Sequence, residues 1–220
     1  MRITEIDQQF VAGTYKRFPV EIVRGKGSLV YDPEGKEYID MGSGIGVTSF
    51  GVIDDVWQNA VIEQLQKVQH MSNLYYTEPC AKLAEMLCGR TGMKKVFFCN
   101  SGAEANEAAL KLARRVAFEE SGAEKCEIIS FLNSFHGRTL FSVSVGGQDK
   151  YSSGFGPRPG GITHLPFNDL EALKKTVSER TCAIICEVWQ GEGGILPARH
   201  EFLLALRELC DRFKAMLIFD

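Results

Sequence analysis

The chain has 220 residues, of which 45% are hydrophobic and 24% are charged, and its net charge is −3. These values are typical of a globular protein with a substantial core and exclude a disordered, collagen-like or coiled-coil chain. Because the sequence has neither a basic stripe nor an apolar stretch of roughly 18 residues, we expect no nucleic-acid partner and no membrane partner.

The first fifty residues are typical of a small β-rich unit. In SLVYDPEGKEYIDM, two strand-like runs flank the turn at 32–35, where a proline presets φ and a glycine tolerates positive φ. The glycine run at 42–46 follows this hairpin and opens no helix, so it is not a dinucleotide fingerprint. Helices are predicted at 54–69 and from Thr77, where a capping hydroxyl, an acid and a proline follow one another.

From Lys94 onward, short apolar runs alternate with helical segments. The predicted strands are KKVFFCN, EIISFL, FSVSV, TCAIICEV and AMLIFD, and the predicted helices are 103–120, 169–179 and 200–213. This alternation predicts an α/β fold with a mostly parallel sheet covered on both faces. Since AMLIFD reads as a buried strand and proteins avoid an exposed apolar edge, we expect the chain to be the front portion of a longer one.

The seven cysteines form an odd set without a CxxC pair, and the four histidines share no metal-ligand spacing with them. Free cysteines are typical of the reducing cytosol, so we expect a cytoplasmic protein and no metal site. Cys182 and Cys186 alternate with isoleucine and are expected to be buried in a strand.

The strongest local signal is the strand-to-helix passage KKVFFCN-SGAEANEAALKLARR. Ser101 and Glu104 form a capping box at the start of the helix, and Gly122 is expected to end it. The free N–H groups of Gly102 and Ala103 could hold a phosphate, although an ordinary capped helix has the same pattern. The expected apolar face comprises Ala105, Ala108, Ala109, Leu112 and Val116.

Three further signals follow later strands, at the edge where open α/β sheets bind ligands. In FHGRT, Phe135 offers a flat aromatic face and Arg138 a guanidinium fork for a carboxylate. Glu192 lies in a glycine-rich turn after TCAIIC, and Asp220 closes AMLIF. The structural alternatives are a core Phe beside a surface Arg, a solvated loop acid and a carboxylate that caps the following helix.

These signals, in this order, resemble the class III pyridoxal-phosphate-dependent aminotransferases, and within them the acetylornithine/succinylornithine type. The resemblance rests on RGKGSLVYDPEGKEYIDMGSGIGV, SNLYYTEP, KKVFFCNSGAEANEAALKLAR, SFHGRT, QGEGG and LIFD. It implies the type I aminotransferase fold, a large domain with a mostly parallel mixed sheet plus a small α+β domain. Residues 1–50 would be the N-terminal part of the small domain and 51–220 an incomplete large domain. It also implies a homodimer.

The resemblance further implies the cofactor pyridoxal 5′-phosphate (PLP) and a role for several residues. Its phosphate would be bound at Ser101, Gly102 and Ala103, its ring would stack on Phe135, and its protonated ring nitrogen would pair with Asp220. Arg138, Glu192 and Tyr15 would contact substrate. The family's Schiff-base lysine would lie beyond residue 220, since none of the thirteen lysines here stands in its context.

The chain departs from the family pattern at 51–54, where Gly-His-Pro is usual, and at Val188, where proline is usual. The implied activity is transamination of N-acetylornithine with 2-oxoglutarate, as in arginine biosynthesis. Succinylornithine and ornithine are alternative donors, and a non-catalytic cofactor-binding remnant is an alternative of another class. A nicotinamide dehydrogenase would need a glycine fingerprint that opens a helix, and the sequence has none.

Overall fold

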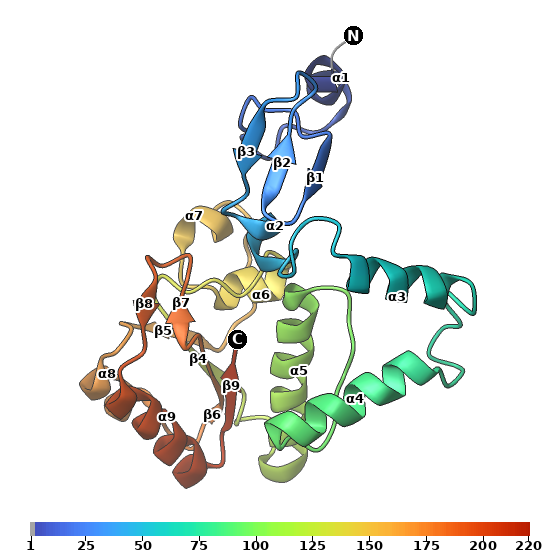
Figure 1. Ribbon diagram of the computed structural model, residues 1–220. Helices are drawn as coiled ribbons and strands as arrows, with labels where there is room; N and C mark the ends of the chain where they lie inside the picture. The colour runs from blue at the N-terminus through green and yellow to red at the C-terminus, as the bar shows by residue number, and fades with distance from the viewer. Residues whose placement is uncertain (1–2) are drawn as a thin grey trace. The chain divides into compact units, whose positions relative to one another are not determined.

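The computed structural model describes residues 3–220. The chain divides into two compact units, with the boundary between Met86 and Leu87. Figure 1 shows the elements of each unit. The assignment of residues 1–50 and 51–220 to a small and a large domain stays a prediction. None of the helices formed by the described residues is long and apolar enough to cross a membrane. The first unit contains α1 (Ile3–Phe10), β1 (Arg24–Lys26), β2 (Leu29–Tyr31), β3 (Glu37–Ile39), α2 (Ser43–Gly46) and α3 (Asp55–Leu65). The helix α4 (Glu78–Thr91) begins in the first unit and ends in the second.

The first unit is built around an antiparallel sheet of order β1-β2-β3. The predicted hairpin is confirmed: Gly35, with φ at +84°, donates its N–H to the carbonyl of Asp32 at 3.0 Å. The carboxylate of Asp32 accepts the next N–H, from Lys36, at 2.8 Å. The helix predicted at 54–69 is present as α3, which ends at Leu65, earlier than predicted, and which Asp54 caps by accepting the N–H of Trp57 at 2.8 Å.

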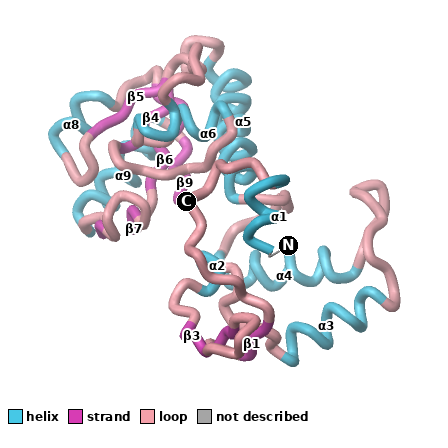
Figure 2. The backbone as a smooth tube through the Cα atoms, turned by 90° about the horizontal axis from the view of Figure 1, so that it is seen from above, coloured by secondary structure: helices cyan, strands magenta, loops and turns pink. Residues whose placement is uncertain are grey.

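The second unit is a parallel sheet of order β5-β4-β6-β9 with helices on both faces, as predicted. In Figures 1 and 2, α5 lies on one side of the sheet and α8 and α9 lie on the other. Its elements are α5 (Gly102–Ser121), β4 (Glu127–Phe131), α6 (Leu140–Val145), α7 (Asp149–Ser152), β5 (Ile162–Leu165), α8 (Leu170–Thr176), β6 (Thr181–Cys186), β7 (Trp189–Gln190), β8 (Leu196–Pro197), α9 (His200–Phe213) and β9 (Met216–Phe219).

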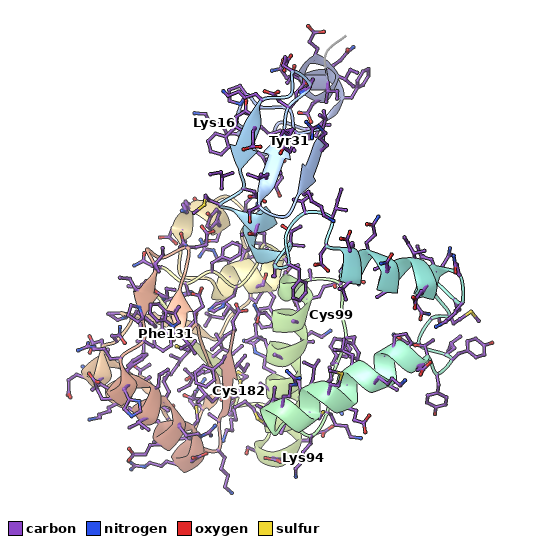
Figure 3. The ribbon with its side chains drawn as sticks, viewed as in Figure 1. Lys16, Tyr31, Lys94, Cys99, Phe131 and Cys182 are labelled. Atoms are coloured by element: carbon purple, nitrogen blue, oxygen red, sulfur yellow. The ribbon has the colours of Figure 1, made fainter. Side chains whose placement is uncertain are left out.

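The sheet core follows from the two-residue period of its strands. On β6, Ile184 and Cys186 pack in the cluster that includes Phe202 of α9, whereas Ala183 and Ile185 pack in the cluster that includes Leu110 of α5. All six residues of β6 are buried, including the two cysteines predicted to be so. Figure 3 labels Phe131, at the carboxyl end of β4, and Cys182, near the start of β6, which mark opposite ends of this sheet.

Two of the predicted strands are wrong. Residues 94–100 pair with none of the described strands, and Phe97 is 71% exposed. An apolar run becomes a strand only where a neighbour completes its hydrogen-bond ladder. The run FSVSV is the helix α6, because Thr139 caps it by accepting the N–H of Ser142 and the Ser144 hydroxyl bonds back to the Leu140 carbonyl. The short strand β5 was not predicted.

The predicted apolar face of α5 is also wrong. The side of the helix that is buried carries Asn106, Leu110, Ala113 and Ala117, whereas Leu112 is 63% exposed. This face is the one that packs on β4 and β6. The many alanines of α5 fit either face, so hydrophobic periodicity alone could not select the one that meets the sheet.

The loop after β4 is held against residues 146–147, and this packing makes a testable prediction. A Cβ on Gly147 would overlap the carbonyl oxygen of Phe131 and lie 2.7 Å from the Cα of Leu132, whereas a Cβ on Gly146 would meet no atom closer than 3.5 Å. We expect Gly147→Ala to lower the free energy of unfolding of the full-length protein by about 1–3 kcal/mol, because backbone atoms must move. Chemical denaturation would measure the loss. An equal change in the control Gly146→Ala would contradict it.

Candidate functional site

The carboxyl ends of β6 and β9 bring Asp220 beside two buried polar residues. The backbone N–H of Asp220 donates to the carbonyl of Cys186 at 3.1 Å, which fixes the end of β9 beside the end of β6. Its side-chain Oδ2 lies 2.7 Å from Nδ1 of His136 and accepts a hydrogen bond from Nδ2 of Asn106 at 2.8 Å. An ionised carboxylate only accepts, so Nδ1 of His136 carries the proton of that bond.

The surroundings of Asp220 keep its carboxyl group charged. Burial by itself raises the pKa of this carboxyl, but the hydrogen bonds from His136 and Asn106 outweigh burial and bring the pKa below its ordinary value. Asp220 therefore presents a negative charge at the strand ends across the neutral pH range. A cationic group of a ligand is the natural partner for such a carboxylate.

The helix α5 begins with N–H groups that no described residue uses. Ser101 caps the helix as predicted, since its hydroxyl accepts the N–H of Glu104 at 3.2 Å. The carboxylate of Glu104 reaches back one residue further than a standard capping box and accepts the N–H of Asn100 at 2.6 Å. Among residues 3–220, no acceptor is found for the N–H of Gly102 or Ala103, and a Cβ on Gly102 would meet open space. This end of the helix can bind an anion.

The loop that carries Phe135 and Arg138 lies against the start of α5. Gly137 has φ at +116°, and a Cβ there would lie 2.7 Å from the Cβ of Ala103. The same loop is tied to α5 by Asn106, which donates to the carbonyl of His136 at 2.9 Å. The half-buried ring of Phe135 packs edgewise with Tyr151, with ring centroids 5.6 Å apart. The structure thus brings the helix start, the Phe135 loop and Asp220 together.

Sequence reasoning missed a second carboxyl group in this region, Glu187. It directly follows β6, and its Oε2 accepts the N–H of Phe135 at 3.2 Å. Burial raises the pKa of Glu187, and the charge of Asp220 raises it further, although the hydrogen bond from Phe135 opposes both. Asn106 and His136 were missed as well. The available signals were the position of His136 inside FHGRT and that of Asn106 one helical turn after Ala103.

The three residues predicted to contact substrate are exposed, unlike the buried residues that bond to Asp220. Arg138 is exposed and follows Gly137 directly. Glu192 is exposed in the turn after β7, and Gln190 next to that turn donates from its side chain to the carbonyl of Leu132 at 3.0 Å. Tyr15 lies in the other unit and is 59% exposed. Within residues 3–220, no group of three or more His, Cys, Asp or Glu side chains could hold a metal ion.

Comparison with known proteins finds relatives that are named as aminotransferases or transaminases. The sequence model of the family described as aminotransferase class-III matches residues 10–220. Acetylornithine aminotransferase of Vibrio vulnificus strain YJ016 is 54% identical over 204 residues, which cover 92% of this chain and 51% of that protein. Succinylornithine transaminase of Photorhabdus laumondii subsp. laumondii is 56% identical over 198 residues, 90% of this chain and 49% of that protein.

Solved structures give the same result for the fold. An ornithine aminotransferase from Toxoplasma gondii, crystallized with oxidized glutathione and with PLP partly occupying its active site, matches with a TM-score of 0.93 at 29% identity. The match covers 99% of this chain and 52% of that one. The predicted α/β aminotransferase fold is confirmed. The chain spans about half the length of the relatives that it matches.

Proposed function

Because the chain belongs to the class-III aminotransferase family, we propose that the full-length protein is a PLP-dependent aminotransferase that transfers the amino group of N-acetylornithine to 2-oxoglutarate. The observation that carries this proposal is the charged carboxylate of Asp220, held at the strand ends beside the open start of α5. The two named relatives above support the choice of an N-acylated ornithine as donor.

The residues of the chain fit the proposed cofactor. PLP has a phosphate at one end and a ring nitrogen at the other, and both carry charge. The unused N–H groups of Gly102 and Ala103 suit the phosphate, and the lowered pKa of Asp220 suits a protonated ring nitrogen. Phe135 offers an aromatic ring on the loop that lies against the start of α5. Ser101 contributes by capping α5, since its hydroxyl is bonded to Glu104.

In this proposal, bound PLP supplies an electron sink for the carbanion that forms when the substrate carbon bearing the amine loses a proton. The residues of this chain hold that sink in place and set its charge. Asp220 would keep a proton on the ring nitrogen through its carboxylate, and the first N–H groups of α5 would bind the phosphate. Phe135 would offer its aromatic face to the ring. In our proposal, the lysine that moves the substrate proton is none of the thirteen lysines in the given sequence.

We assign Arg138 to a carboxylate of the substrates, with Glu192 and Tyr15 as further substrate contacts. A guanidinium binds a carboxylate through two parallel hydrogen bonds, which lysine cannot reproduce. In the full-length protein, Arg138→Lys is expected to lower kcat/KM for 2-oxoglutarate about tenfold or more. Steady-state kinetics would measure it, with Arg158→Lys, another exposed arginine of the same unit, as the control. Unchanged kcat/KM in Arg138→Lys would contradict the assignment.

The proposed reaction can be tested directly with purified full-length protein and PLP. Initial rates with 2-oxoglutarate would be compared for N-acetylornithine, succinylornithine and ornithine as donors. We expect ping-pong kinetics, with parallel lines in double-reciprocal plots, because the amino group is transferred in two half-reactions. We expect the highest kcat/KM with N-acetylornithine. A higher kcat/KM with succinylornithine or ornithine would assign that compound as the donor instead. PLP binding without turnover on any donor would indicate a non-catalytic remnant and would overturn the proposal.

We further propose that the full-length protein is a cytoplasmic homodimer. Large apolar side chains lie exposed on α3, where Val56 is 80% and Trp57 is 59% exposed, and a second copy would cover such a surface. All seven cysteines are free, which suits a reducing compartment. Light scattering of the full-length protein would test the dimer, and a monodisperse monomer would overturn it.

A further inference from the structure

The hydrogen bonds of Asp220 converge on one of its two carboxylate oxygens. His136 and Asn106 both bond to Oδ2, at 2.7 Å and 2.8 Å. Within residues 3–220, these are the side-chain hydrogen bonds found for this carboxylate. On the basis of the proposed function, we propose that His136 and Asn106 are positioning residues, which occupy Oδ2 of Asp220 and leave Oδ1 to bind the ring nitrogen of PLP.

The two positioning residues are rigid because they are buried and bonded to each other. His136 is 1% exposed and Asn106 is 6% exposed. The amide of Asn106 donates both to Oδ2 of Asp220 and to the backbone carbonyl of His136, at 2.9 Å. The three residues therefore form a closed ring of hydrogen bonds that joins α5, the loop after β4 and the end of β9. Rotation of the carboxylate would break two of these bonds at once.

The ring of hydrogen bonds also links the two ends of the proposed cofactor site through one helix, α5. Ala103 and Asn106 are three residues apart on α5 and so lie about one turn apart on the same side of the helix. The first turn of α5 presents the N–H groups for the phosphate, and Asn106 fixes the carboxylate for the ring nitrogen. The same rigid element thus sets the distance between the two anchor points.

The side chain of His136 contributes one hydrogen bond to this ring of hydrogen bonds, from Nδ1 to Oδ2 of Asp220. Nε2 of His136 is buried and has no hydrogen-bond partner among the described residues. Replacement by phenylalanine keeps a ring of similar size and removes the bond to Oδ2, so His136→Phe is expected to fold. Asp220 then keeps the hydrogen bond from Asn106 alone and is less restrained in orientation and charge.

The test compares two ligands of the full-length apoprotein: PLP and its analogue in which the ring nitrogen is replaced by C–H. Both compounds keep the phosphate and the aldehyde, so the ratio of their dissociation constants isolates the interaction at the ring nitrogen. We expect wild type to prefer PLP and His136→Phe to reduce that preference about tenfold, the value of one hydrogen bond to a charged group. Asn106→Ala is expected to act in the same direction. His164→Phe, which removes a histidine bonded to the Val145 carbonyl at 2.9 Å, is the control.

The outcomes separate this inference from the proposed function. A wild-type protein that binds neither compound, or both equally, would overturn the ring-nitrogen role of Asp220 and the inference with it. A wild type that prefers PLP, with the same preference in His136→Phe and Asn106→Ala, would overturn the inference alone. Weaker binding of both ligands by the same factor would also overturn it, because that result indicates a merely structural role. Thermal melts and circular dichroism of each variant check the fold.

Discussion

Replacing Asp220 by alanine in the full-length protein is expected to lower kcat for transamination about 100- to 1,000-fold, the scale of losing one preorganised electrostatic partner of the reacting group. Asp220 is the acid that bonds to His136 and Asn106, so its replacement removes the carboxylate proposed to hold a proton on the ring nitrogen. The ring is then a poorer electron sink for the substrate carbanion. Steady-state rates at saturating donor and acceptor would measure the loss.

The variant Asp220→Asn sharpens this test. Its amide oxygen can accept the same two hydrogen bonds as Oδ2, but it carries no charge. We therefore expect turnover to fall almost as far as in Asp220→Ala while the free energy of unfolding stays closer to wild type. Asp211→Asn, on the exposed end of α9 where Asp211 pairs with Arg207, is the control. Full turnover in Asp220→Asn would show that the charge of Asp220 is not used.

Local sequence signals predicted the elements whose causes are local. The cap at Ser101, the end of α5 at Gly122 and the turn at Asp32 each depend on side chains within about one turn of the affected backbone. The buried strand β6 was predictable because all its residues are apolar or small. The wrong predictions concern segments whose state depends on distant partners: residues 94–100, which lack a neighbouring strand among those described, and α6, whose valines suit a strand as well as a helix.

The same division holds for the candidate site. Phe135 and Asp220 could be proposed from the sequence because they follow β4 and β9, and strand ends of one sheet meet at one edge. Gly102 could be proposed because the cap at Ser101 marks the start of α5. Asn106 and Asp220 are separated by 114 positions, and His136 and Asp220 by 84, so their hydrogen bonds leave no local pattern. Glu187 was overlooked in favour of Glu192 because a strand-terminal acid and a loop acid look alike without the contact to Phe135.

Gly137 joins the Phe135 loop to α5, and its replacement is expected to disturb the site and the fold together. A Cβ there would lie 2.9 Å from the backbone Cα of Ala103 and 2.7 Å from the Ser142 hydroxyl oxygen. Its φ of +116° is also unfavourable for any residue with a side chain. Gly137→Ala is therefore expected to lower the free energy of unfolding by ~2–4 kcal/mol, from overpacking and backbone strain combined.

The same substitution is expected to weaken PLP binding more than the loss of stability alone explains. Moving the loop away from Ala103 displaces Phe135 and widens the space in front of the first N–H groups of α5, where the phosphate is proposed to bind. Dissociation constants measured well below the melting temperature separate this effect from unfolding. Gly160→Ala is the control, because a Cβ on Gly160 would meet nothing within 4 Å. If Gly137→Ala binds PLP as tightly as Gly160→Ala, the loop does not need this close approach, and the phosphate site proposed at Gly102 and Ala103 loses its main structural support.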